Sequence, residues 1–224
     1  MTLALARVPL ARLVRTPRAL GFGALWALVA IVSAVVARRT TNGADHVMRG
    51  SFGYVVVPLV AFAIVGAALG GQGLKRGVRG VVTLGASPRL AALAATLVSV
   101  VVSAALCGLL AIVVCGIAHG AADPPLARDL FASAWVSALG GAAYAAFFSC
   151  GSAIGKGALR GGFLAIDWIF GSGAGVASLV VPRGHVTALL GGALAADLPA
   201  RASSVILLLQ IALYTALAAI LTKR

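Results

Sequence analysis

The residue with the clearest chemical potential is Asp167, which lies within an apolar stretch of the chain. An ionisable side chain is costly inside a membrane segment, so it marks either a functional site or a structural role. A structural role would place it beside lipid headgroups or pair it with Arg160 or Lys156. Gln210 and Tyr214, on a later apolar stretch, are the polar side chains that would share a site with it. Asp167, Gln210 and Tyr214 therefore form a candidate intramembrane polar site.

No second set of residues has the types and spacing of an active site or a metal centre. The three histidines are far apart, and no HExxH, GxSxG or paired-carboxylate pattern occurs. An intramembrane enzyme built on Asp167 needs a second acid, a histidine or a metal set at the same depth, and the sequence offers none. The cysteines have no CxxC spacing and are expected to be small buried hydrophobes: Cys107, Cys115 and Cys150. We therefore predict no metal site and no catalytic residues.

The stretch GSAIGKGALR at 151–160 resembles a phosphate-binding loop only in part. That loop has four residues between its first glycine and the GK pair, and Ser or Thr after the pair. Here three residues lie between Gly151 and Gly155, and Gly157 follows Lys156. We therefore expect no ATP hydrolysis and no cofactor on this chain.

The composition requires a membrane around the elements that carry these residues. The chain of 224 residues is 61% hydrophobic and 10% charged, whereas soluble domains are about 45–50% apolar and about 25% charged. The apolar residues form blocks long enough to cross a hydrocarbon core of ~30 Å. We predict an all-α polytopic membrane protein, a single domain over 1–224, with six transmembrane helices at approximately 20–37, 54–71, 90–118, 131–150, 162–181 and 203–222.

The basic residues predict the orientation of these helices. In the six-helix topology, twelve of the 18 Lys and Arg residues lie on the side of both chain ends and six on the other. Because loops rich in Lys and Arg stay inside, both termini are expected in the cytoplasm, at the cytoplasmic (inner) membrane. The net charge of +13 is then explained by contacts with anionic lipids, so no nucleic-acid partner is expected.

The first 18 residues predict an interfacial amphipathic helix ahead of the first span. Arg7, Arg12, Arg15 and Arg18 share one side of a helical wheel, and most apolar residues lie elsewhere. Such a helix lies in the plane of the headgroups.

The cytoplasmic loop at 72–89 is basic and rich in glycine, and it leads into the third span through a proline. It is either a solvated loop that obeys the positive-inside rule or a docking surface for a cytoplasmic partner. Under the second interpretation, the docking residues are Lys75, Arg76, Arg79, Ser87, Pro88 and Arg89.

This loop, LKRGVRGVVTLGASPR at 74–89, together with the length and topology of the chain, resembles the membrane subunit of type-2 ATP-binding-cassette (ABC) exporters. The loop of that family has a Gly, a short apolar stretch and then a small residue, Pro and Arg before the third span. Ser87, Pro88 and Arg89 match this ending. The acidic residue that often precedes the Gly is replaced here by Lys75 and Arg76.

The resemblance implies a permease that moves an unidentified substrate with ATP hydrolysed by a separate ABC ATPase subunit docked at this loop. It also implies a dimer, either of two copies or with a second permease, and short re-entrant helices in the outer loop at 182–202. The alternative is a membrane scaffold or assembly factor that transports nothing. A partner ATPase distinguishes the two hypotheses.

Overall fold

The computed structural model describes residues 2–39, 43–121, 123–155, 157, 159–171 and 175–222, and within these ranges the chain is helical without strands. The elements in chain order are α1 (Thr2–Arg15), α2 (Pro17–Ala37), α3 (Gly43–Val47), the π-helix η1 (Met48–Val56), α4 (Val57–Ala68), α5 (Leu74–Val82), α6 (Pro88–Ala118), α7 (Leu126–Ala153), α8 (Leu159–Phe170), the 3-10 turn η2 (Val176–Leu179), α9 (Pro182–Leu189), the 3-10 turn η3 (Ala195–Asp197) and α10 (Ala200–Thr222). The predicted all-helical class is confirmed.

Four helices of the described chain are long and apolar enough to cross a membrane. They are Gly43–Ala68, Pro88–Ala118, Leu126–Ala153 and Ala200–Thr222, with 26, 31, 28 and 23 residues. At a rise of ~1.5 Å per residue each exceeds the ~30 Å of a hydrocarbon core. A shorter apolar helix covers Gly21–Ala37, within α2. These helices are consistent with a multi-pass membrane protein.

The helix Gly43–Ala68 begins earlier than the second predicted span. We expected a span at 54–71 after an outer loop, but α3, η1 and α4 form one helix over Gly43–Ala68. Two glycines of this helix lie in close contact with other parts of the bundle. A Cβ on Gly43 would lie 2.4 Å from the carbonyl oxygen of Ala37, and one on Gly53 would lie 2.4 Å from Leu190 Cδ1. Small residues of this kind allow membrane helices to approach closely.

The predicted fifth span at 162–181 is wrong as a continuous helix. α8 ends at Phe170 after 12 residues, about 18 Å at the usual rise. The chain then continues through η2 into α9. Gly171 lies against α9, where an added Cβ would be 2.4 Å from the Cβ of Arg183. The break therefore brings α9 back against the end of α8.

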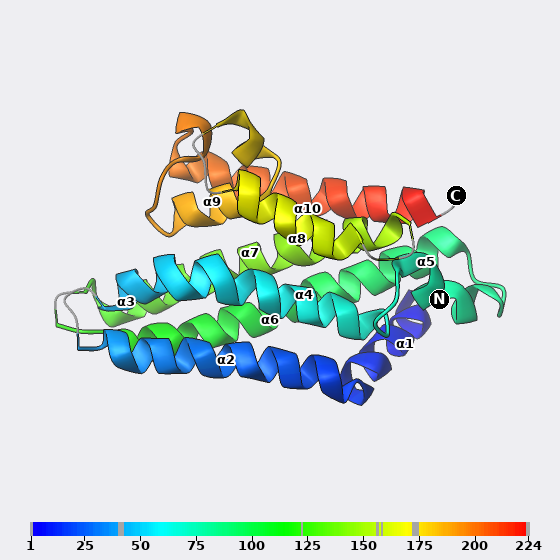
Figure 1. Cartoon of the computed structure of the whole chain (residues 1–224), viewed down its shortest axis with the longest axis horizontal. Coiled ribbons are helices and arrows are strands. Elements are labelled where there is room, and N and C mark those ends of the chain that lie inside the picture. The colour runs from blue at the N-terminus through cyan, green and yellow to red at the C-terminus, as the bar shows by residue number, and fades with distance from the viewer. Residues whose placement is uncertain are drawn as a thin grey trace.

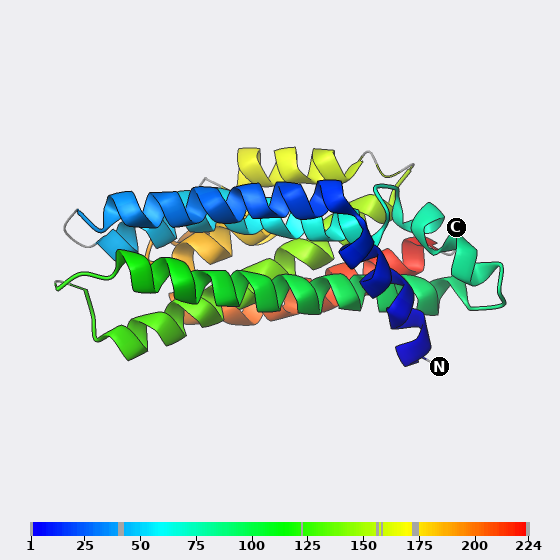
Figure 2. The ribbon, with the colours of Figure 1, turned by 90° about the horizontal axis from the view of Figure 1, so that it is seen from below.

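α7 forms the centre of the bundle and packs against α4, α6, α8, α9 and α10. Every residue from Leu139 to Ala153 is buried. α6 approaches α7 closely where a Cβ on Gly141 would lie 2.7 Å from the carbonyl oxygen of Ser103. Figures 1 and 2 show α2, α4, α6, α7 and α10 running lengthwise, with α8 on the outside of the bundle.

The two ends of the bundle differ in the elements that they carry. α1, α5 and the C-terminal end of α10 lie at one end, whereas α3 and the connection between α6 and α7 lie at the other (Figure 1). α1 turns sharply from the direction of α2 (Figure 2) and packs on α4 and α6. The helix passes through Pro9, and Pro17 begins α2. Arg7 and Arg15 are exposed, and the side chain of Arg18 lies outside the described set.

Candidate functional site

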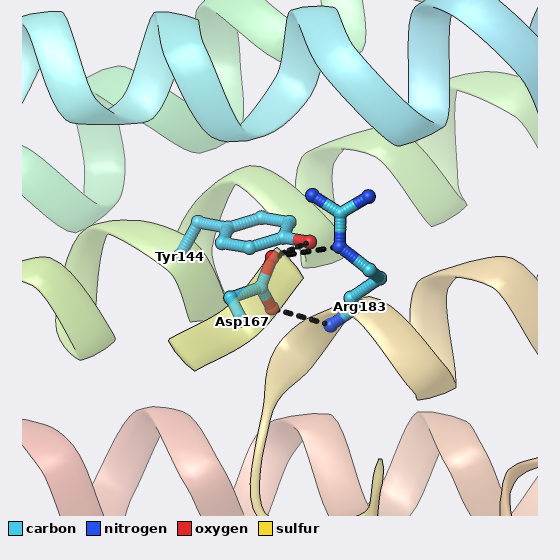
Figure 3. A network of polar contacts seen from close by, with 3 residues as sticks. All are labelled: Tyr144, Asp167 and Arg183. Atoms are coloured by element: carbon cyan, nitrogen blue, oxygen red, sulfur yellow. Dashed lines mark hydrogen bonds and ion pairs between the residues drawn. The ribbon is translucent and has the colours of Figure 1, made fainter. Parts of the chain in front are cut away.

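Asp167 is buried in an ion pair with Arg183 at the junction of α7, α8 and α9. The Nε atom of Arg183 donates to Oδ2 of Asp167 at 2.9 Å, and the backbone N–H of Arg183 donates to Oδ1 at 3.1 Å. The hydroxyl of Tyr144 on α7 donates to Oδ2 at 3.2 Å. Figure 3 shows the three side chains converging. The carboxylate of Asp167 thus accepts three hydrogen bonds from two other elements.

The partner of Asp167 differs from the residues that its sequence neighbourhood suggested. Arg160 lies at the start of α8 and contacts the ring of Phe62 instead. Lys156 lies outside the described residues. Arg183 was expected among the outer-loop basic residues, yet its side chain is 1% exposed and that of Asp167 is fully buried. A buried charge requires a partner and further hydrogen bonds, which explains why Arg183 is drawn into the bundle. The sequence signal for a helix that contains Arg183 was Pro182, which begins α9 at a position where helices favour proline.

Gln210 and Tyr214 bind the segment before α9 and make no hydrogen bond to Asp167. Nε2 of Gln210 donates to the carbonyl of Leu179 at 2.8 Å, and the hydroxyl of Tyr214 donates to the carbonyl of Val180 at 2.5 Å. Both carbonyls belong to the segment that precedes α9. The predicted trio therefore does not form one cluster: Asp167 binds α9 itself, whereas the two α10 residues hold the chain that leads into it.

His185 completes the attachment of α9 and was missed by the sequence analysis. Its ring is fully buried, with Nε2 at 3.1 Å from the carbonyl of Leu179 and Nδ1 at 3.2 Å from the hydroxyl of Ser203. A carbonyl only accepts, so Nε2 carries the proton and Nδ1 accepts from Ser203.

Aromatic rings cover the guanidinium of Arg183. Its central carbon lies 3.9 Å from the ring centroid of Tyr54 on η1 and 5.6 Å from that of Trp168 on α8. The two terminal nitrogens are buried and have no hydrogen-bond partner among the described residues. In Figure 3 they point away from Asp167, toward the ribbon of the long helix that contains η1 and α4.

The predicted docking loop contains α5, which presents a basic face at one end of the bundle. Leu74, Gly77 and Val78 are buried against the bundle, while Arg76 and Arg79 are exposed and Lys75 is partly exposed. A side-chain nitrogen of Arg12 donates to the carbonyl of Gly77, which ties α1 to this loop. The loop continues to Leu84, which is 88% exposed.

The end of this loop forms the start of α6. Ser87 is the residue before the helix, and its carbonyl accepts from the N–H of Ala91 at 3.0 Å. Pro88 occupies the first helical position, and Arg89 is exposed. The chain contains five acidic residues, none of them between positions 46 and 122. The basic face of this loop therefore has no acidic residue of its own segment to neutralise it.

Two further observations limit the chemistry of the site. Among the described residues, no group of three or more His, Cys, Asp or Glu side chains is arranged to hold a metal ion. The cysteines are free and buried: Cys107, Cys115 and Cys150.

Comparisons with known proteins matched no family model, no curated protein and no solved structure.

Proposed function

We propose that this chain is the permease subunit of an ABC exporter and that a separate ATPase docks on α5. The chain crosses the membrane six times, with both ends in the cytoplasm and α1 in the cytoplasmic headgroup region. α2 makes the first crossing. The fifth crossing is the broken one: α8 enters from the α5 end, and the segment through η2 and α9 completes it.

The observation that carries the proposal is the position and exposure of α5. A short helix lies across one end of the bundle, between two helices of membrane-spanning length, and turns its basic residues outward. This end also holds α1 and the last turn of α10 (Figure 1). A loop that served only orientation would not need a helix packed through Leu74, Gly77 and Val78.

A route for movement follows from the connections of α5. It leads through Ser87 and Pro88 directly into α6, which packs along α7 for most of its length. α7 carries Tyr144, which binds Asp167. Closure of two docked ATPase subunits would shift α5 and α6 together, and the bundle would change between two discrete arrangements. The chain acts as a dimer, with itself or with a second permease.

The test is copurification of an ATPase with the tagged chain from its native membrane in mild detergent. We expect a soluble protein with the pattern GxxxxGK[ST] and ATP hydrolysis by the complex. In the variant Lys75→Glu/Arg76→Glu/Arg79→Glu, the yield of this partner should fall about tenfold or more, because charge reversal at an interface costs several kcal/mol.

A matched control reverses three exposed arginines at the other end, Arg38→Glu/Arg39→Glu/Arg128→Glu. This control should retain the partner. Recovery of the chain without any ATPase, where a known exporter keeps its own, would favour the non-transporting scaffold. Equal recovery from both triple variants would remove α5 as the docking site.

A further inference from the structure

Two arginines on the α8 side of the molecule have guanidinium atoms without partners. Nη1 and Nη2 of Arg183 and Nε and Nη1 of Arg160 are buried and find no acceptor in the described part of the chain. A buried donor without an acceptor costs about 1–3 kcal/mol. Two such groups on one side of a bundle are unusual, because the great majority of buried polar groups are paired.

Both arginines stack on rings of the same long helix. The guanidinium of Arg183 lies 3.9 Å from the ring centroid of Tyr54, and that of Arg160 lies 4.6 Å from the ring centroid of Phe62. Tyr54 and Phe62 are eight residues apart in the helix Gly43–Ala68, about 12 Å along its axis. The two cations therefore lie in succession along the side of the bundle where α8 runs.

The ion pair with Asp167 leaves the binding edge of Arg183 free. Asp167 engages Nε and the backbone N–H, whereas the terminal nitrogens are the pair that holds a carboxylate or phosphate in a bidentate manner. Asp167 thus orients the guanidinium without occupying this edge. Tyr54 covers the guanidinium and is 39% exposed, so its side chain can turn outward and admit an oxygen ligand.

The charge balance favours an anion at this place. Asp167 is paired with Arg183, whereas Arg160 forms no ion pair within the described residues. The remaining acids lie on other elements: Asp45 pairs with Arg49, Asp129 lies beside His119, Asp123 accepts from the N–H of Gly120, and Asp197 is in η3. One positive charge is therefore left without an acidic partner in the described chain.

The surface beside the arginines is apolar. α8 buries only Asp167 and exposes Ile166, Ile169 and Phe170. A ligand that reached the arginines from this face would contact hydrocarbon side chains with the rest of its body.

We infer that the α8 face binds an amphiphile with a phosphate or carboxylate head, held by Arg183 and Arg160, and an apolar tail along α8. This inference deepens the proposed export function, on which it rests, by naming the chemical class of the substrate. The head group first meets Arg160 near the α5 end and then Arg183 farther along α8.

The test measures binding to the purified chain without any ATPase, so it is independent of docking. Trp168 lies 5.6 Å from the guanidinium of Arg183 and reports the site after Trp26→Phe and Trp135→Phe. The probe is a dodecyl phosphate with bromine on its chain, which quenches tryptophan fluorescence on contact, in uncharged maltoside micelles. We expect saturable quenching. Arg183→Gln and Arg160→Gln should each weaken it about tenfold or more, since a hydrogen bond to a charged group contributes about that factor.

Controls separate this site from partitioning and from misfolding. Arg201→Gln, at an exposed arginine, should bind like the unmodified chain, and the same brominated chain with a trimethylammonium head should not saturate. The double variant Asp167→Asn/Arg183→Gln keeps an uncharged hydrogen-bonding pair and should stay folded yet lose binding. Equal quenching by the cationic probe, or no effect of either arginine, would overturn the inference. If inorganic phosphate displaced the probe at the same concentration as unbrominated alkyl phosphate does, the site would bind a free anion, and the assignment of an amphiphile would be wrong. If the chain bound the probe but no ATPase copurified with it, the proposed export function would be wrong and the inferred binding site would stand.

Discussion

At the residue scale, the interior of the molecule contains an ion pair between two residues that are distant in the sequence. Asp167 and Arg183 are 16 positions apart. The side chain of Asp167 is fully buried, and that of Arg183 is 1% exposed. Such a pair contributes little net stability compared with apolar residues, but loss of one partner leaves a buried charge alone. Replacement of one member of the pair is therefore expected to be more destabilising than replacement of both by apolar residues.

We predict that Asp167→Asn destabilises the chain by about 3–5 kcal/mol, because Arg183 then keeps a buried charge without a carboxylate. Asp167→Leu/Arg183→Met, which removes both charges, should be less destabilising than Asp167→Asn alone. Thermal unfolding of each variant in detergent measures the difference. Equal melting temperatures for Asp167→Asn and the unmodified chain would show that the ion pair does not contribute to stability.

At the element scale, Gly171 allows the chain at the end of α8 to lie close to Arg183 on α9. A Cβ on Gly171 would lie 2.4 Å from the Cβ of Arg183 and 2.5 Å from the carbonyl oxygen of Asp167. A Cβ on Gly161, within α8, would meet no atom within 4 Å. The two glycines are therefore a matched pair for testing whether α8 and α9 must touch.

Gly171→Ala should destabilise the chain by about 1–3 kcal/mol, because α9 must move away from α8. Gly161→Ala should be neutral or stabilise it by up to ~1 kcal/mol, since alanine is the better helix former. Chemical or thermal unfolding in detergent gives both values. A Gly171→Ala chain as stable as the unmodified one would mean that the close approach of α8 and α9 is dispensable.

At the scale of the whole molecule, the two ends of the bundle have different chemistry. One end combines α1 with the exposed basic face of α5, and the other includes Asp45, Asp123 and Asp129. This asymmetry is the basis of the proposed orientation.

Cysteine labelling tests this orientation. In a background with the native cysteines changed to alanine, Leu84→Cys should react with a membrane-impermeant maleimide only after the membrane is opened. Leu126→Cys, exposed at the other end, should react in intact cells. The reverse pattern would place α5 outside and exclude cytoplasmic docking.

The sequence by itself determined the helical class and the elements near α1, α6, α7 and α10, and its prediction of a membrane environment is consistent with the four long apolar helices of the described chain. These features depend on apolar length and on residues within a few turns of each other, so local patterns are sufficient. Asp167 was also identified as the residue to examine, because charge is rare in an apolar stretch.

Only the tertiary structure decided the partners of that residue and the course of the chain around it. Arg183 and His185 looked like loop residues, Gly43–Gly53 looked like a loop, and 162–181 looked like one span. The contacts that decided otherwise join distant positions: Arg183 to Asp167 across 16 residues and Tyr214 to Val180 across 34. Local hydropathy contains no information about such contacts, because they form only when α8, α9 and α10 are packed together.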